Sequence, residues 1–344
     1  MTPQRLDLMA AVPHGIAEQL PLTRRQVLAG AALLAGATAW PGIGQAQDAW
    51  PSRPIRVVVP YPAGGNTDLT AREIMGEVGR ILNQSIIVDN KAGANGIIGT
   101  EAVAKSPADG YTVLVAIGAF TINPVLQKSL PYKVDDFEPV GLTGRVNLVL
   151  AASPVLPARS FAELVALGRS GMKLSYDSSG IGSALHLVGE RISLATGIGA
   201  LHVPYKGIAQ SLPDIISGRV SFTINTVAAL GPYIREGRLR PLAVLSKNRS
   251  AELPGVATIA EAGYPTLESY AWQGLLVPAD TPQAVVTRLA SAVATALSRQ
   301  ALRDKLVRMG TDPVSSSPAE FAAFLRDDQA KVREVVRATN LKAD

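Results

Sequence analysis

The apolar positions of the chain follow two alternating periods. The run Ile55–Val59 is nearly continuous and rich in β-branched residues, as in a strand that is buried on both faces. From Leu69 to Leu82, apolar side chains return at three- and four-residue steps, which predicts a helix with one buried face. Further strands are predicted over 86–88 and 112–116, again followed or preceded by glycine-rich turns and helical patterns. This alternation favours a parallel sheet covered by helices.

A second series of strands and helices begins near residue 147. Strands are predicted over 148–152, 174–176, 202–203, 220–224 and 242–245. The rest of the chain is predicted to be mostly helical, and two capping boxes, Ser160–Glu163 and Ser317–Glu320, mark helix starts. The sequence therefore predicts an α/β protein with two lobes, each a mainly parallel sheet flanked by helices. The expected boundaries are 47–145 with 270–344 for lobe 1, and 146–269 for lobe 2.

The first 46 residues, 1–46, have the pattern of an export signal. Arg24 and Arg25 precede an apolar stretch that is too short to anchor the chain in a bilayer. Small residues at Gly44 and Ala46 occupy the positions that a signal peptidase requires, so we expect cleavage after Ala46. The paired arginines resemble a twin-arginine signal, and an ordinary secretory signal is the alternative. Either signal predicts that the mature chain lies in the periplasm.

Composition narrows the possible chemistry. The 344 residues include no Cys, which excludes disulfides, thiolate metal sites and thiol nucleophiles. Only three His are present, which argues against a His-based metal centre. The net charge of +5 is spread along the chain, and the sequence has neither a dinucleotide fingerprint nor a phosphate-binding loop. We therefore expect no cofactor, no metal and no nucleic-acid partner.

Two glycine-containing loops follow predicted strands and lead directly into predicted helices. They are residues 60–68 and 177–183. In an open parallel sheet, ligands bind where the strands end, and the N-terminus of a helix attracts anions through its free N–H groups. The sequence predicts that these two helix starts face each other across a cleft and bind the two ends of an anionic ligand. A third segment, 118–123, is predicted to be a loop that lines the wall.

Two points qualify this prediction for the first and second loops. Asn66, Thr67 or Asp68 could simply cap the following helix, and the carboxylate of Asp68 would need a bridging water beside an anion. In the second loop, Ser183 and His186 lie three residues apart, which leaves a serine hydrolase as an alternative. A nucleophile elbow requires GxSxG, whereas residues 180–184 read Gly-Ile-Gly-Ser-Ala, so we expect binding without catalysis.

Several motifs, in this order along the chain, resemble a single family. They are Val58–Gly65 with Asp68, Asn90–Gly96, Ser106–Tyr111, Ser178–Ser183 with His186, and His202–Gly207. These motifs are similar to the signatures of the Bug family, the periplasmic solute receptors of tripartite tricarboxylate transporters. The resemblance implies a type II periplasmic binding protein of the Venus-flytrap kind. It also implies that the chain captures a small organic carboxylate and delivers it to membrane permease subunits. We expect a monomer, and a receptor that reports the acid to a signalling partner is an alternative.

The resemblance also implies which residues contact the ligand. In lobe 1 the implied contacts are Tyr61, Ala63, Gly64, Thr67, Asp68 and, from the side, Thr121. We add Asn66, which lies in the same loop. In lobe 2 they are Ser178, Gly182 and Ser183, with His186 beside the loop and Asn225 closing the cleft. Asn225 stands where many members of the family have an acidic residue, which favours a purely anionic acid over one that carries an ammonium group.

Overall fold

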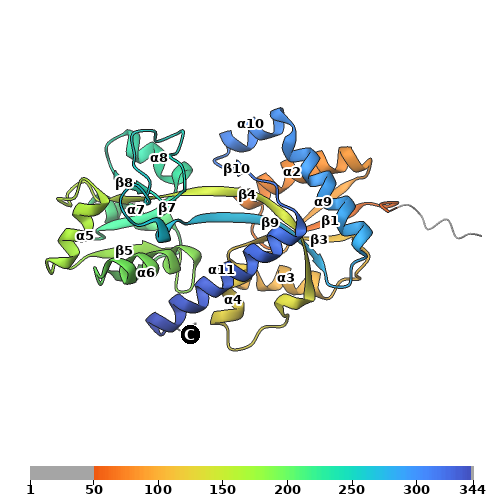
Figure 1. Ribbon diagram of the computed structural model, residues 1–344, viewed down its shortest axis with the longest axis horizontal. Helices are drawn as coiled ribbons and strands as arrows, with labels where there is room; N and C mark the ends of the chain where they lie inside the picture. The colour runs from red at the N-terminus through yellow and green to blue at the C-terminus, as the bar shows by residue number, and fades with distance from the viewer. Residues whose placement is uncertain (1–49, 342–344) are drawn as a thin grey trace, which may run out of the picture. The chain divides into compact units, whose positions relative to one another are not determined.

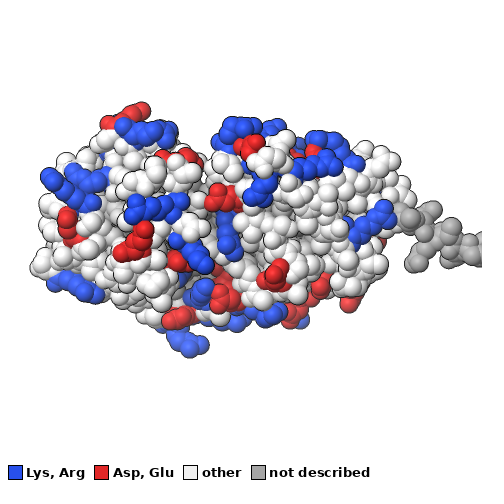
Figure 2. All heavy atoms as spheres, turned by 45° about the horizontal axis from the view of Figure 1, so that its top comes forward, with Lys and Arg blue, Asp and Glu red and all other residues white. Residues whose placement is uncertain are grey.

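The computed structural model describes residues 50–341 of the chain. The predicted export signal, with its paired arginines and its cleavage position after Ala46, lies outside these residues. Among the described residues, no helix is both long and apolar enough to cross a membrane. Lys and Arg side chains are interspersed with Asp and Glu side chains on the face drawn in Figure 2.

The strands of the described residues join into one ten-stranded sheet (Figure 1). Its main path runs β2-β1-β3-β9-β4-β7-β5-β6, and β8 and β10 also pair with β4. The strands are β1 (Ile55–Val59), β2 (Ile86–Asn90), β3 (Thr112–Ile117), β4 (Phe137–Ala152), β5 (Ser175–Ser178), β6 (Leu201–Pro204), β7 (Phe222–Thr226), β8 (Arg240–Val244), β9 (Tyr270–Pro278) and β10 (Asp312–Pro313). Every predicted strand is thus confirmed. The ends differ by at most two residues, except that β4 begins eleven residues before the predicted 148–152.

Parallel pairing holds the two ends of the sheet, and antiparallel pairing holds its middle. Strand β1 lies parallel to β2 and β3, and β5 lies parallel to β6 and β7. Strand β4 runs antiparallel to β9 along residues 137–147, and residues 148–152 then pair with β7 and β8. Strands β4 and β9 therefore connect the two halves, which we call lobe 1 and lobe 2 as predicted; the exact boundaries between the lobes stay a prediction.

Two parts of this middle region differ from the sequence prediction. Residues 270–278 were expected within a mostly helical segment, and this is wrong because they form β9. The apolar run from Gly274 to Val277 is buried on both sides, and such a run shows no period that separates a strand from a buried helix. The first eleven residues of β4 were not predicted, because the register shifts near Gly141 and Gly144 interrupt any alternation.

Helices cover both faces of the sheet (Figure 1). They are α2 (Asn66–Leu82), α3 (Ile97–Ala104), α4 (Ala119–Leu126), α5 (Phe161–Arg169), α6 (Ala184–Thr196), α7 (Ile208–Ile216), α8 (Val227–Arg235), α9 (Gln283–Ser298), α10 (Gln300–Arg308) and α11 (Pro318–Thr339), with short 3₁₀ turns at Ala94–Gly96, Val134–Asp136 and Pro265–Leu267. Both predicted helix starts are confirmed. Ser160 Oγ accepts a hydrogen bond from the Glu163 amide, and Ser317 and Glu320 form a reciprocal capping box.

The segment 118–123 was predicted to be a loop, and this is wrong because most of it belongs to α4. The Gly118 carbonyl accepts hydrogen bonds from the amides of Thr121 and Ile122, which starts the helix. The side chains of Phe120 and Ile122 are buried, so packing outweighs the turn-forming residues that suggested a loop.

Each lobe has apolar cores on both faces of its part of the sheet. In lobe 1, strands β1, β3 and β9 pack against α2 and α9 on one face and against α4 and α11 on the other. In lobe 2, α5 and α6 cover one face, and α7 and α8 cover the other. A further apolar cluster joins the lobes, because Leu187 of α6 packs with Ile122 and Leu126 of α4 and with Val332 and Val335 of α11.

Candidate functional site

The starts of α2 and α6 open onto one cavity of about 470 Å³. Tyr61, Asn66 and Thr67 line this cavity from the loop after β1 and from the first turn of α2. Ser183 and Ala184 line it from the start of α6. The two helix N-termini that the sequence predicts to face a ligand therefore share one hollow, as expected.

Four of the predicted contact residues lie on the cavity wall, namely Tyr61, Asn66, Thr67 and Ser183. The others are not among the residues that line the cavity: Ala63, Gly64, Asp68, Thr121, Ser178, Gly182, His186 and Asn225. As ligand contacts, all of these residues stay predictions. The structure gives several of the second group a supporting position, which is described next.

Asp68 holds the first loop together. Its buried carboxylate accepts hydrogen bonds from the Gly64 amide at 2.8 Å, from Arg72 Nε at 2.9 Å and from Asn90 Nδ2 at 2.9 Å. Burial opposes ionisation of Asp68, but these hydrogen bonds outweigh it and lower the pKa of the carboxyl. The N-cap of α2 is Gly65, which has no side chain to cap the helix. The first N–H groups of α2 are thus left for a ligand or for water.

Tyr61 is placed by a glycine of the next loop. A Cβ built on Gly96 would lie 2.9 Å from Tyr61 Oη, and Gly96 has a φ of +86°, so only glycine fits there without strain. The Tyr61 carbonyl accepts a hydrogen bond from Asn90 Nδ2 at 3.1 Å, and burial raises the pKa of the Tyr61 hydroxyl. The motif 90–96 thus supports the first loop, and its Asn95 also lines the cavity.

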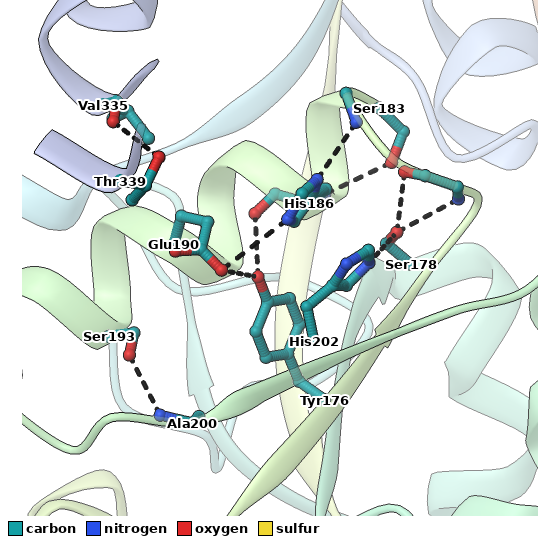
Figure 3. Close-up of polar contacts among 12 residues, drawn as sticks. Tyr176, Ser178, Ser183, His186, Glu190, Ser193, Ala200, His202, Val335 and Thr339 are labelled. Carbon is teal, nitrogen blue, oxygen red and sulfur yellow. Dashed lines mark hydrogen bonds and ion pairs between the residues drawn. The ribbon is translucent and has the colours of Figure 1, made fainter. Parts of the chain in front are cut away.

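The second loop is held by two stacked imidazole rings (Figure 3). Ser183 Oγ caps α6 by accepting a hydrogen bond from the His186 amide, and Nδ1 of His186 accepts one from the Gly182 amide at 3.0 Å. The rings of His186 and His202 stack with centroids 3.6 Å apart. The second ring, that of His202, is tied to the loop through a hydrogen bond of 2.7 Å between its Nε2 and Ser178 Oγ.

The groups around the two rings shift the pKa values of Glu190 and His202. Glu190 Oε1 accepts a hydrogen bond from the Tyr176 hydroxyl at 2.6 Å and lies 3.6 Å from His186 Nε2 (Figure 3). The hydrogen bond to His186 is the main cause that lowers the pKa of Glu190. Burial, and then the neighbouring His186, lowers the pKa of His202 to about 4. His202 is therefore neutral at ordinary pH.

This arrangement does not activate Ser183 as a nucleophile. The Ser183 hydroxyl accepts the backbone N–H of His186 rather than contacting its ring. Nδ1 of that ring is already occupied by the Gly182 amide, and Nε2 faces Glu190. A general base would have to accept the hydroxyl proton of Ser183, and neither ring nitrogen of His186 faces it.

Several cavity residues were not predicted from the sequence. Tyr270, Trp272 and Gln273 of β9 form part of the wall, and so does Phe324 of α11. The aromatic residues at alternate positions 270 and 272 were the available signal for a strand with one aromatic face. Phe324 lies far along the chain from β9 and carried no comparable signal.

Thr121 and Asn225 were both predicted to contact the ligand, and both are engaged within the protein. Thr121 Oγ1 donates a hydrogen bond to Asp328 Oδ2 at 2.6 Å, and Trp272 Nε1 donates to the same oxygen at 3.3 Å. Asn225 Oδ1 accepts the amide of Thr226 at 2.8 Å, and it is Thr226 that lines the cavity.

Comparisons with known proteins agree with this architecture. The family model described as "Tripartite tricarboxylate transporter family receptor" matches residues 70–341. Protein BugT of Bordetella pertussis (strain Tohama I) is 37% identical over 300 residues, which cover 86% of this chain and 92% of that protein. A solved R. palustris structure with adipate is 35% identical, has a TM-score of 0.72 and covers 85% of this chain and 99% of its own. MatC from Rhodopseudomonas palustris with bound malate is 28% identical, has a TM-score of 0.69 and covers 83% of this chain and 100% of its own.

Proposed function

Because the chain belongs to the tripartite tricarboxylate transporter receptor family, whose members are periplasmic solute-binding proteins, we propose that it binds a small organic carboxylate between its two lobes. In this proposal the mature chain acts in the periplasm, delivers the acid to the permease subunits of a tripartite tricarboxylate transporter, and catalyses no reaction. The adipate and malate bound by two relatives support an acid as the ligand.

The observation that carries the proposal is the shared cavity at the starts of α2 and α6. Each helix N-terminus presents free N–H groups and about half a positive charge, which together favour a carboxylate over a neutral group. An acid that contacts both starts would tie the lobes together, and this would shift an equilibrium between separated and closed lobes towards the closed form. Because backbone N–H groups would bind the carboxylates, the site needs no Lys or Arg side chain at the two helix starts.

The direct test is calorimetric titration with a panel that includes malate, adipate and succinate. We expect at least one acid to bind, and no heat with any acid of a broad panel would count against the proposal. Ala184 gives a sharp variant, because it is exposed, lines the cavity and lies in the first turn of α6.

An Ala184→Asp variant would put a negative charge where the ligand carboxylate is expected. We expect acid affinity to fall by about tenfold or more, while the stability of the protein is unchanged or higher, because an acidic residue suits a helix N-terminus. Ala184→Asn has a similar shape without the charge and should lose much less affinity. Equal affinities of the two variants would place the carboxylate elsewhere.

A further inference from the structure

The cavity does not end at the two helix starts but continues along α6. Ala184, Leu187, Val188 and Arg191 all line it. Their spacing of three and four residues places them on one face of the helix. From Ala184 to Arg191 this face extends for roughly 10 Å, since an α-helix rises 1.5 Å per residue.

One face of α11 also lines this extension. Phe324, Asp328, Val332 and Val335 recur at three- and four-residue steps and all line the cavity. Trp272 of β9 lines the extension as well. We call this extension the α6–α11 chamber and define it by Leu187, Val188, Trp272, Phe324, Val332 and Val335.

The middle of the chamber is apolar and aromatic. The rings of Trp272 and Phe324 meet edge to face with centroids 5.5 Å apart. The indole N–H of Trp272 is already donated to Asp328, so Trp272 offers the chamber its ring rather than a free donor. Such a wall favours flat or bulky apolar groups, because aromatic rings pack well edge to face and in offset stacks.

Two of the cations at the far end of the chamber are partnered within the protein, and Glu268 adds a carboxylate to the same part of the cavity wall. Arg191 Nη2 donates to the Thr266 carbonyl at 2.7 Å, and its Nη1 donates to Ser269 Oγ at 3.2 Å. Lys331 pairs with Asp327 at 2.7 Å. The end of the chamber is therefore polar, while the apolar section lies between it and the helix starts.

We propose that the acid carries a ring or a similarly bulky apolar group, which occupies the α6–α11 chamber while a carboxylate lies at the starts of α2 and α6. This inference rests on the proposed function and names the class of acid. The size of the cavity supports it: about 470 Å³ lies within the roughly 300–1,000 Å³ of pockets that enclose drug-sized ligands. A four-carbon diacid alone would leave the wall at Val188 and Phe324 uncovered, since Leu187, Val332 and Val335 already pack against one another.

The test compares acids that differ only by a phenyl ring. The pairs are succinate with phenylsuccinate, and butyrate with phenylbutyrate, each titrated by calorimetry into the exported chain. We expect the ring-bearing member of at least one pair to bind about tenfold tighter or more, because the ring leaves water for an apolar wall. In the variant Val188→Phe, a larger side chain fills the chamber, and this advantage should vanish while succinate affinity stays within about twofold. Val188→Ala is the matched control and should keep the advantage.

A fluorescence measurement reports on the chamber without a filling mutation. Only Trp50 and Trp272 are tryptophans of the described residues, and Trp272 lines the cavity. In a Trp50→Phe variant of the exported chain, the ring-bearing acid should change the emission of Trp272 more than its ring-free partner does. Equal affinities within both pairs, with no response to Val188→Phe, would overturn this inference and leave the proposed function standing. Failure of every acid to bind would overturn both.

Discussion

At the scale of single residues, the second loop depends on His186 Nδ1 as a hydrogen-bond acceptor and on the neutral ring of His202. Nδ1 of His186 can accept the Gly182 amide only while it carries no proton. The ring of His202 stacks on that ring at 3.6 Å, and after burial this neighbour is the second cause that lowers the pKa of His202. The loop at the start of α6 therefore keeps its form while His186 Nδ1 accepts the Gly182 amide and the His202 ring is neutral.

Stability should consequently fall in acid through His202. Its pKa is lowered to about 4 in the folded protein, against about 6.5 for an unfolded His. Between these values the unfolded chain takes up a proton that the folded chain does not, so the free energy of unfolding falls as the pH drops through this window. The ring is only half-buried, and after allowance for solvent screening we expect this one group to account for about 1 kcal/mol.

A His202→Gln variant isolates that contribution. Glutamine keeps a hydrogen-bonding group near Ser178 but does not titrate, so urea unfolding near pH 7 and near pH 4.5 should show a smaller acid loss than in the wild type. Lys206→Gln, an exposed change nearby, is the control and should keep the full acid loss. If His202→Gln lost as much stability as the wild type, another group would be responsible.

At the scale of elements, α11 crosses β9 at a glycine. A Cβ built on Gly274 would lie 2.2 Å from Cζ of Phe321, which is fully buried under the strand. The close approach of α11 to the sheet therefore requires glycine at this position. The same approach brings Phe324 and Asp328, one and two turns further along α11, to the cavity.

We expect Gly274→Ala to destabilise the protein by about 1–3 kcal/mol, because the added methyl group must displace the Phe321 ring or the strand. Gly255→Ala is the matched control: a Cβ there has no neighbour within 4 Å, and the change should stay within about 0.5 kcal/mol. Urea unfolding of both variants measures the difference. A harmless Gly274→Ala would mean that α11 can shift away from β9 at little cost.

Much of the fold could be predicted because its elements carry local signals. The β-branched run Ile55–Val59 is the signal for β1. The capping box of α11 is made by Ser317 and Glu320, which lie only three residues apart in the sequence. The starts of α2 and α6 could be predicted as facing sites, since in each lobe a glycine loop follows the carboxyl end of a strand, which is where ligands bind. The two strands, β1 and β5, run in opposite directions in the sheet, so that these ends point toward each other. Local signals failed for α4, where burial of Phe120 overrides turn-forming residues.

The remainder of the site depends on contacts between distant segments. The direction of the Asp68 carboxylate is set by Arg72 and Asn90, so its sequence position alone does not tell whether it faces a ligand. The α6–α11 chamber likewise exists because residues near 188 and 332 come together across β9. The local pattern of hydrophobic positions in either segment does not predict this contact.

At the scale of the whole described unit, the two lobes contact each other beside the cavity. A Cβ built on Gly118, at the start of α4, would lie 3.6 Å from Cβ of Ala184, at the start of α6. Leu187 of α6 also packs against α4 and α11 in the apolar cluster that joins the lobes. Because Ala184 lines the cavity as well, this contact lies at its rim, and a ligand that enters between the lobes would have to separate it.

A disulfide across this contact should therefore slow ligand entry. The chain has no Cys, so the double variant Gly118→Cys/Ala184→Cys would contain a single possible pair, and the 3.6 Å separation lies within the roughly 3.5–4.5 Å between Cβ atoms of disulfides. With the bond formed, we expect the association rate of a bound acid, followed by stopped-flow tryptophan fluorescence, to fall about tenfold or more, and to recover on reduction. The single variants Gly118→Cys and Ala184→Cys cannot form this bond, so each should bind the acid at the same rate under oxidising and reducing conditions. An oxidised double variant that bound as fast as the reduced one would mean that acids reach the cavity without separation of the lobes, and closure around the ligand would then no longer account for its capture.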